Sequence, residues 1–188
     1  MCRFITAVVP ADADLQASTP LLDKYDMSFK EVKTSFVGAQ LESDRYVRAT
    51  RSACDCDSVL GSASPQREAE QTTIPHSTNI EKLRKKGWSQ HKIERWLSEK
   101  SGSLDRRQQQ DKSKHDAELT QWCEFISALL LSGFTKRLGL LLHMYKGSID
   151  DERIRIKRIE HLSLSEQLDN ELLSMDEDVL YIIEKVNR

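Results

Sequence analysis

The stretch that decides the fold is "CRFITAVV", residues 2–9. It is almost continuously apolar and rich in β-branched residues, which is typical of a strand buried on both faces of a sheet. Pro10 follows directly and ends the pattern. We therefore expect residues 2–9 to form a central strand, around which the rest of the chain builds a sheet.

Four further stretches have strand-like patterns, and helical patterns separate some of them. The strand-like stretches are "MSFKEVKTSF" (27–36), "RYVRATRS" (45–52), "RLGLLLHMY" (137–145) and "RIRIKRI" (153–159). A first helix is expected before residue 27, with Pro20 near its start. A last helix is expected over 179–186, because Asp176–Asp178 place carboxylates at its N-terminus. This order predicts an α+β fold: a mostly antiparallel sheet of about five strands with helices packed on it.

The first three strands suggest a split β-α-β arrangement. In it the strand at 45–52 lies between the strands at 2–9 and 27–36 and runs antiparallel to both. The end of the third strand then lies beside the start of the first. This topology predicts that Cys54 and Cys56 approach Cys2.

A basic helical segment, residues 81–132, is inserted between the two groups of strands. Gly87 breaks the helical pattern and Ser89 is placed to cap a new helix. The segment ends in an apolar stripe with helical spacing, formed by Leu119, Trp122, Cys123, Ile126, Leu129 and Leu130. Residues 61–79 are polar and contain two prolines, so we expect a flexible loop there within a single domain, 1–188.

Charge is unevenly distributed along the chain. Residues 81–114 hold eleven Lys and Arg against five Asp and Glu, a net charge of +6, while residues 1–80 carry −3 and residues 148–188 carry −5. A basic patch of this kind suits an acidic partner. We expect a protein partner that contacts Lys82, Arg84, Lys85, Lys86 and Lys92. The predicted function is a small regulatory protein that acts by docking, as adaptor and immunity proteins do.

Nucleic acid is an alternative partner for the same segment. "KLRKKGWSQHKIERWL", residues 82–97, resembles the opening of a helix-turn-helix DNA-binding motif, with a glycine turn followed by Ser-Gln at the head of the second helix. That resemblance implies a nucleic-acid binder whose affinity falls steeply with salt.

The three cysteines that the topology brings together form the best candidate for a chemical site. Cys2, Cys54 and Cys56 could bind zinc with a fourth ligand, or form a disulfide as a redox switch. They could also be inert, half-buried thiols. If Met1 is removed, Cys2 becomes an N-terminal nucleophile. Its Met-Cys start is similar to that of class II glutamine amidotransferases, although Arg3 stands where they have glycine.

Other features limit the function classes. The chain has no phosphate-binding glycine loop, HExxH or GxSxG motif, so we lean away from an enzyme, and His143 is expected to be a core histidine with a hydrogen-bond partner. No apolar run approaches the length of a membrane span. With four cysteines and no signal-peptide pattern, the sequence predicts a cytoplasmic protein.

Overall fold

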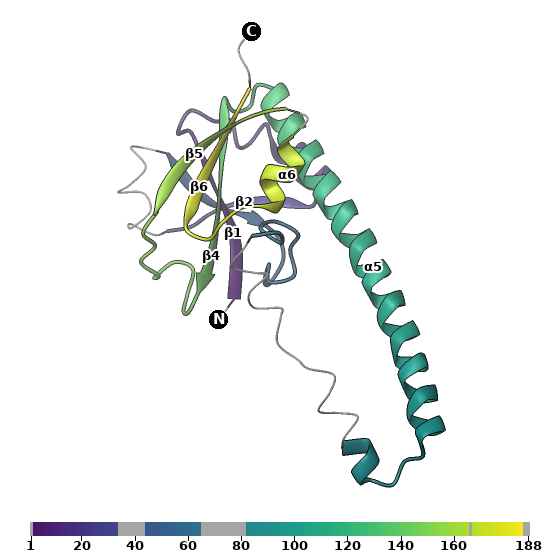
Figure 1. Cartoon of the computed structure of the whole chain (residues 1–188). Coiled ribbons are helices and arrows are strands. Elements are labelled where there is room, and N and C mark those ends of the chain that lie inside the picture. Colours follow the sequence, from purple (N-terminus) through teal and green to yellow (C-terminus); the bar gives the residue numbers. More distant parts are fainter. Residues whose placement is uncertain (1, 34–43, 65–81, 166, 186–188) are drawn as a thin grey trace.

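The computed structural model describes residues 2–33, 44–64, 82–165 and 167–185. Within them the chain forms one six-stranded sheet in the order β2-β3-β1-β4-β6-β5 (Figure 1). The strands are β1 (Cys2–Val9), β2 (Met27–Glu31), β3 (Arg45–Thr50), β4 (Arg137–Tyr145), β5 (Arg158–Ser163) and β6 (Val179–Glu184). The helices are α1 (Thr19–Lys24), α5 (Gln90–Leu131) and α6 (Leu168–Leu173).

Strand β1 is central, as its apolar run predicts. It pairs antiparallel with β3 on one side and with β4 on the other, so that Thr6 lies opposite both Arg48 and Leu141. Strand β3 also pairs antiparallel with β2. The split β-α-β arrangement is therefore confirmed, and so is the α+β class with a mostly antiparallel sheet, since only β5 and β6 run parallel among the described strands.

The C-terminal third corrects two predictions from the sequence. Residues 179–184 are strand β6 and not a helix, and the strand expected at 153–159 begins only at Arg158. Strand β6 lies between β4 and β5 and is largely buried, so apolar residues occupy both of its faces. A short continuous apolar run fits a buried strand as well as a helix. The sheet consequently has six described strands, one more than expected.

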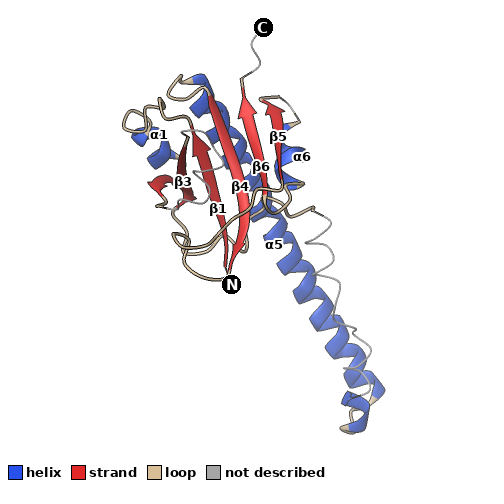
Figure 2. Cartoon of the chain, turned by 90° about the vertical axis from the view of Figure 1, so that its left-hand side faces the viewer, coloured by secondary structure: helices blue, strands red, loops and turns tan. Residues whose placement is uncertain are grey.

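The main core lies between the sheet and its helices. Helices α1, α6 and the C-terminal part of α5 cover one face of the sheet, as Figure 2 shows. The predicted stripe on α5 is confirmed, because every one of its six residues is buried in this core or packed against it. A smaller cluster on the other face includes Tyr46, Leu141 and Tyr145 and is covered by the connection that carries Ile149, Ile154 and Ile156.

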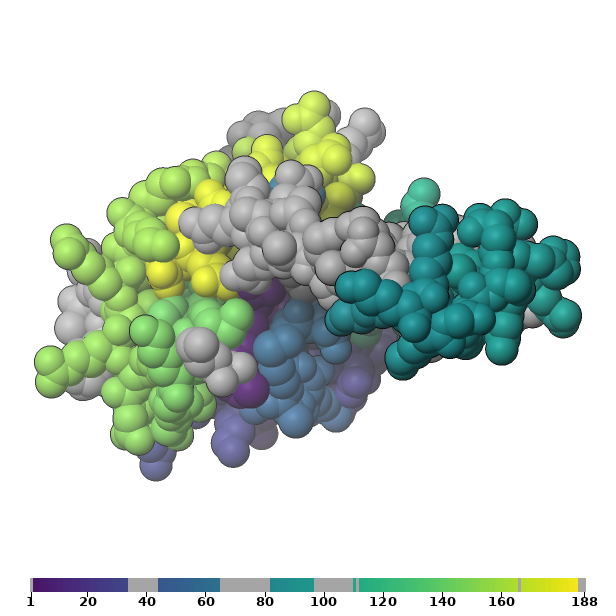
Figure 3. Space-filling view, turned by 60° about the horizontal axis from the view of Figure 1, so that its bottom comes forward, coloured from purple at the N-terminus to yellow at the C-terminus, as the bar shows by residue number. Residues whose placement is uncertain are grey.

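Helix α5 is much longer than its apolar stripe. It runs unbroken from residue 90 through Gly102 to residue 131. Apart from Ile93 at the far end, the described buried residues of α5 lie from Trp122 onward. The 22 residues from 90 to 111 extend away from the body for about 33 Å at 1.5 Å per residue. Figures 1 and 3 show this projection. We call residues 82–111 the arm and residues 82–96 the arm tip. Among the described residues, no helix is both long and apolar enough to cross a membrane.

Candidate functional site

The arm tip is a compact turn that the sequence specifies locally. Residues 82–85 form one helical turn that Gly87 ends with a φ of +77°. The N–H of Gly87 donates to the carbonyl of Arg84, and the N–H of Trp88 donates to that of Leu83, which is the Schellman pattern. Ser89 then caps α5 by accepting a hydrogen bond from the N–H of Lys92. The predicted break and cap are both confirmed.

Basic side chains are concentrated at this tip. Residues 82–96 contain six Lys and Arg and one acid, Glu94. All five predicted partner-binding residues are exposed: Lys82, Arg84, Lys85, Lys86 and Lys92. Lys92 lies over the Trp88 ring, 4.4 Å from its centroid, and Arg84 donates to Gln90. No described carboxylate is ion-paired with these five residues, so their positive charge faces solvent.

The base of the arm is fixed to the body by side chains of α5. Glu118 accepts hydrogen bonds from the Ser58 hydroxyl at 2.5 Å and from the N–H of Val59 at 3.1 Å. Gln121 donates to the carbonyl of Tyr25, and Trp122 is buried. The helix is therefore held at its base by the segment that follows the cysteines.

The Cys54–Cys56 turn (residues 54–56) lies against the first residues of β1. The N–H of Arg3 donates to the Cys56 sulfur at 3.3 Å, and the carbonyl of Arg3 accepts from the N–H of Asp55 at 2.9 Å and from the Cys54 thiol at 3.8 Å. The Cys54 and Cys56 sulfurs are 2.7 Å apart. The predicted approach of the third strand's end to the start of β1 is thus seen at Arg3.

Asp55 is a structural residue in this turn. Its carboxylate accepts hydrogen bonds from the buried N–H of Ile5 at 2.9 Å and from the Thr50 hydroxyl at 2.8 Å. Only 5% of Asp55 is exposed, and this burial raises the pKa of its carboxyl group. Asp57, two residues further along the chain, is exposed. The pairing of β1 with β3 stops at Thr6 and Arg48, and Asp55 supplies the acceptor for the next N–H of β1, that of Ile5.

Cys2 occupies a different environment from the other two cysteines. It is exposed, while Cys54 and Cys56 are half-buried and form hydrogen bonds with its neighbour Arg3. In the described part of the chain, no group of three His, Cys, Asp or Glu side chains is arranged to hold a metal ion. Zinc binding by Cys2, Cys54 and Cys56 therefore stays a prediction. Cys123, by contrast, packs against the core as expected.

A cavity of about 270 Å³ opens beside the Cys54–Cys56 turn. Cys54 lines it, together with four carboxylates: Asp26, Asp55, Asp57 and Glu118. No Lys or Arg is among its described lining residues, although Arg51 contacts Asp26 at 3.7 Å. The space that gives access to the Cys54 sulfur is therefore acidic.

The opposite face of the sheet holds a charged group that sequence reasoning missed. His143 on β4 contacts Asp178 through Nδ1 at 2.5 Å, and its Nε2 lies 3.7 Å from Glu152. Its ring also packs edge-on against Tyr145, which contacts the Tyr46 hydroxyl at 2.9 Å. His143 was expected to be a partnered core histidine, and Asp178 is that partner. The group was missed because residues 176–178 were assigned to a helix start.

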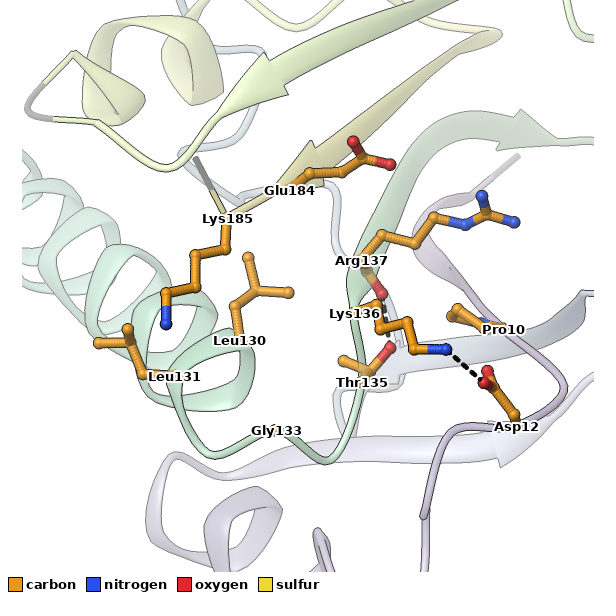
Figure 4. Close-up of a pocket in the computed structure, with 10 residues that line it drawn as sticks. All are labelled: Pro10, Asp12, Leu130, Leu131, Gly133, Thr135, Lys136, Arg137, Glu184 and Lys185. Atoms are coloured by element: carbon orange, nitrogen blue, oxygen red, sulfur yellow. Dashed lines mark hydrogen bonds and ion pairs between the residues drawn. The ribbon is translucent and has the colours of Figure 1, made fainter. Parts of the chain in front are cut away.

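Another cavity lies at the other end of the sheet. It measures about 750 Å³ and lies between the end of α5 and the starts or ends of three strands (Figure 4). Its charges are largely paired within the protein: Lys136 contacts Asp12 at 2.9 Å, and Arg137 contacts Asp44 at 2.9 Å. This cavity therefore offers few free groups for binding or chemistry.

Comparison of this chain with protein-family models, with curated proteins and with solved structures gave no match. The arm tip and the Cys54–Cys56 turn are therefore the candidate functional sites.

Proposed function

We propose that this protein docks on an acidic surface of another protein through its arm tip. The observation that carries the proposal is the position of five exposed cations at the end of a helix that projects about 33 Å from the body. Residues 98–111 contain one large apolar residue, Leu104, so this part of the helix has no apolar face to bury in a core. A helix that is polar all round is typical of one that bridges between bodies.

Charge outside the arm favours a protein partner over nucleic acid. The whole chain carries −2 and residues 81–114 carry +6, so the remaining residues carry −8. A polyanion that extends past the tip is repelled by this acidic body. An acidic patch on a folded protein avoids that repulsion, because it meets the tip alone. The cations steer such a partner and set the binding orientation more than they add affinity.

Site-specific cross-linking identifies the partner. A photoreactive amino acid at position 85 is expected to capture one protein in cells, whereas the same group at Ile159, an exposed residue of the body, is not. The captured protein is then purified and its binding measured with purified components. Capture alone is insufficient, because basic surfaces attract many acidic proteins.

Charge reversal at two positions then tests the docking surface. K85E/K86E at the tip and K112E/K114E at the base of the arm change the net charge equally, and all four lysines are exposed. The tip variant is expected to weaken the complex at least about tenfold and the base variant less than about threefold. Both should change the free energy of unfolding by less than about 1 kcal/mol.

The proposal fails if the two variants weaken the complex equally, or if neither does. It also fails if the wild-type protein binds a DNA or RNA oligonucleotide more tightly than the captured protein, with a steep loss of affinity in salt. That result establishes the nucleic-acid alternative.

A further inference from the structure

Two thiols outside the proposed docking surface are positioned to react with each other. The Cys54 and Cys56 sulfurs are 2.7 Å apart, about 0.7 Å more than the length of an S–S bond. Neither cysteine is part of a disulfide. Only a small displacement therefore separates the reduced pair from a disulfide.

The surrounding hydrogen bonds fix both sulfurs in this arrangement. The Cys54 sulfur accepts from the N–H of Cys56 at 3.3 Å, and the Cys56 sulfur accepts from the N–H of Arg3, also at 3.3 Å. Asp55, between them, is held by Ile5 and Thr50. The turn is anchored on the central strand, so chain motion does not separate the two sulfurs. The pair is therefore pre-organised to form a disulfide.

The cavity beside the pair selects the reagent that reaches it. Cys54 lines this cavity with four carboxylates, and both cysteines are half-buried. Negative charge around an opening lowers the local concentration of anions and raises that of cations. A disulfide with several free carboxylates is therefore disfavoured, and a small disulfide without net negative charge is favoured.

We propose that Cys54 and Cys56 form a redox-active dithiol that exchanges with small disulfides carrying no net negative charge. One thiolate of the pair attacks the small disulfide, forms a mixed disulfide and releases one small thiolate. The second sulfur of the pair loses its proton, attacks the mixed disulfide and releases the other. The protein gives up two electrons and two protons, and one small disulfide becomes two small thiols.

Peptide mass spectrometry can follow this reaction without ambiguity. Cleavage after Lys and Arg gives one peptide, residues 52–67, that contains Cys54 and Cys56 and no other cysteine. Cys2 lies in the peptide 1–3 and Cys123 in the peptide 115–136. The reduced full chain is treated with cystamine, a dicationic disulfide, or with oxidised glutathione, an anionic one, and then alkylated and digested.

With cystamine, peptide 52–67 is expected to lose two hydrogen atoms and to resist alkylation. The rate should be about tenfold higher than with oxidised glutathione at low salt, and the ratio should approach one in about 1 M salt. D57N removes an exposed carboxylate from the cavity and should lower the ratio. C56S should accumulate the mixed disulfide at Cys54, whereas C123S should behave as wild type.

Three results overturn the proposal. They are alkylation of both cysteines in peptide 52–67 after cystamine treatment, a link from this peptide to peptide 1–3, and a mixed disulfide that persists in the wild-type chain. Equal rates with the two reagents at low salt overturn the charge preference. None of these results depends on the arm tip, so the docking proposal is tested separately.

Discussion

Replacing Asp55 by alanine should destabilise the protein far more than the same change at Asp57, two residues away. Asp55 is buried and its carboxylate accepts hydrogen bonds from Ile5 and Thr50, whereas Asp57 is exposed. In D55A the N–H of Ile5 stays buried without a partner. Leaving a buried donor unpaired costs about 1–3 kcal/mol of stability. Losing the hydrogen bond from the Thr50 hydroxyl costs about 1 kcal/mol more.

The expected loss in the free energy of unfolding is therefore about 3 kcal/mol for D55A. For D57A we expect a change within about 0.5 kcal/mol, as for other surface sites. D55N keeps one acceptor for Ile5 and should lose about 1 kcal/mol. In a chain of this length, the D55A loss corresponds to a fall in Tm of roughly 6–12 °C.

Urea unfolding measures these differences. Far-ultraviolet circular dichroism and tryptophan fluorescence, to which buried Trp122 contributes, give two independent probes of the transition. Equal stability of D55A and wild type, or equal losses in D55A and D57A, would refute the assignment of Asp55 as the hydrogen-bond partner of β1.

Three further outcomes are expected. Because burial raises the pKa of Asp55, the folded state keeps this proton to higher pH than the unfolded chain; wild type should therefore gain stability relative to D55N in urea titrations as pH falls from about 7 to about 4. Gly61→Ala should cost about 3 kcal/mol or more in thermal unfolding, since its φ is +68° and a Cβ atom there meets the Met175 carbonyl oxygen at 2.5 Å. Gly133→Ala, with a φ of +79° and open space, should cost only about 1 kcal/mol, and equal costs would contradict the packing at Gly61. Ser89→Ala should remove the cap of α5, worth about 1 kcal/mol, and accelerate amide exchange at the start of that helix without lowering global stability; unchanged exchange would contradict the cap.

The strands of the N-terminal half could be predicted because their local patterns agree with their environments. The run at residues 2–9 is apolar on both faces, and β1 does lie between two other strands. Residues 179–184 have an equally apolar run, but Asp176–Asp178 before it imitate a helix start. Asp178 in fact has a φ of +64° and lies in the turn directly before strand β6. Local patterns could not decide this case, because the burial comes from tertiary packing: Val179, Tyr181 and Ile183 lie in the main core, and Leu180 lies in the smaller cluster on the other face.

The position of the Cys54–Cys56 turn could be predicted from the sequence, but the environment of its side chains could be predicted only in part. Strand order alone brings residues 54–56 to the start of β1, and the structure agrees. Asp55 is buried because its carboxylate accepts a hydrogen bond from the N–H of Ile5, which has no backbone partner in β3. No spacing in the sequence reveals this contact. The projection of the arm did have a sequence signature: the apolar stripe on α5 begins only at Leu119, after a long polar stretch.

Because α5 is one continuous helix, the arm moves as a rigid extension of its base. Glu118 fixes the helix near its base to Ser58 and Val59, which directly follow the Cys54–Cys56 turn. A stiff rod converts a small rotation at its base into a large movement at its end. A tilt of about 10° at the base carries the arm tip through about 6 Å over its length of about 33 Å. A small displacement at Ser58 is therefore enlarged at the arm tip.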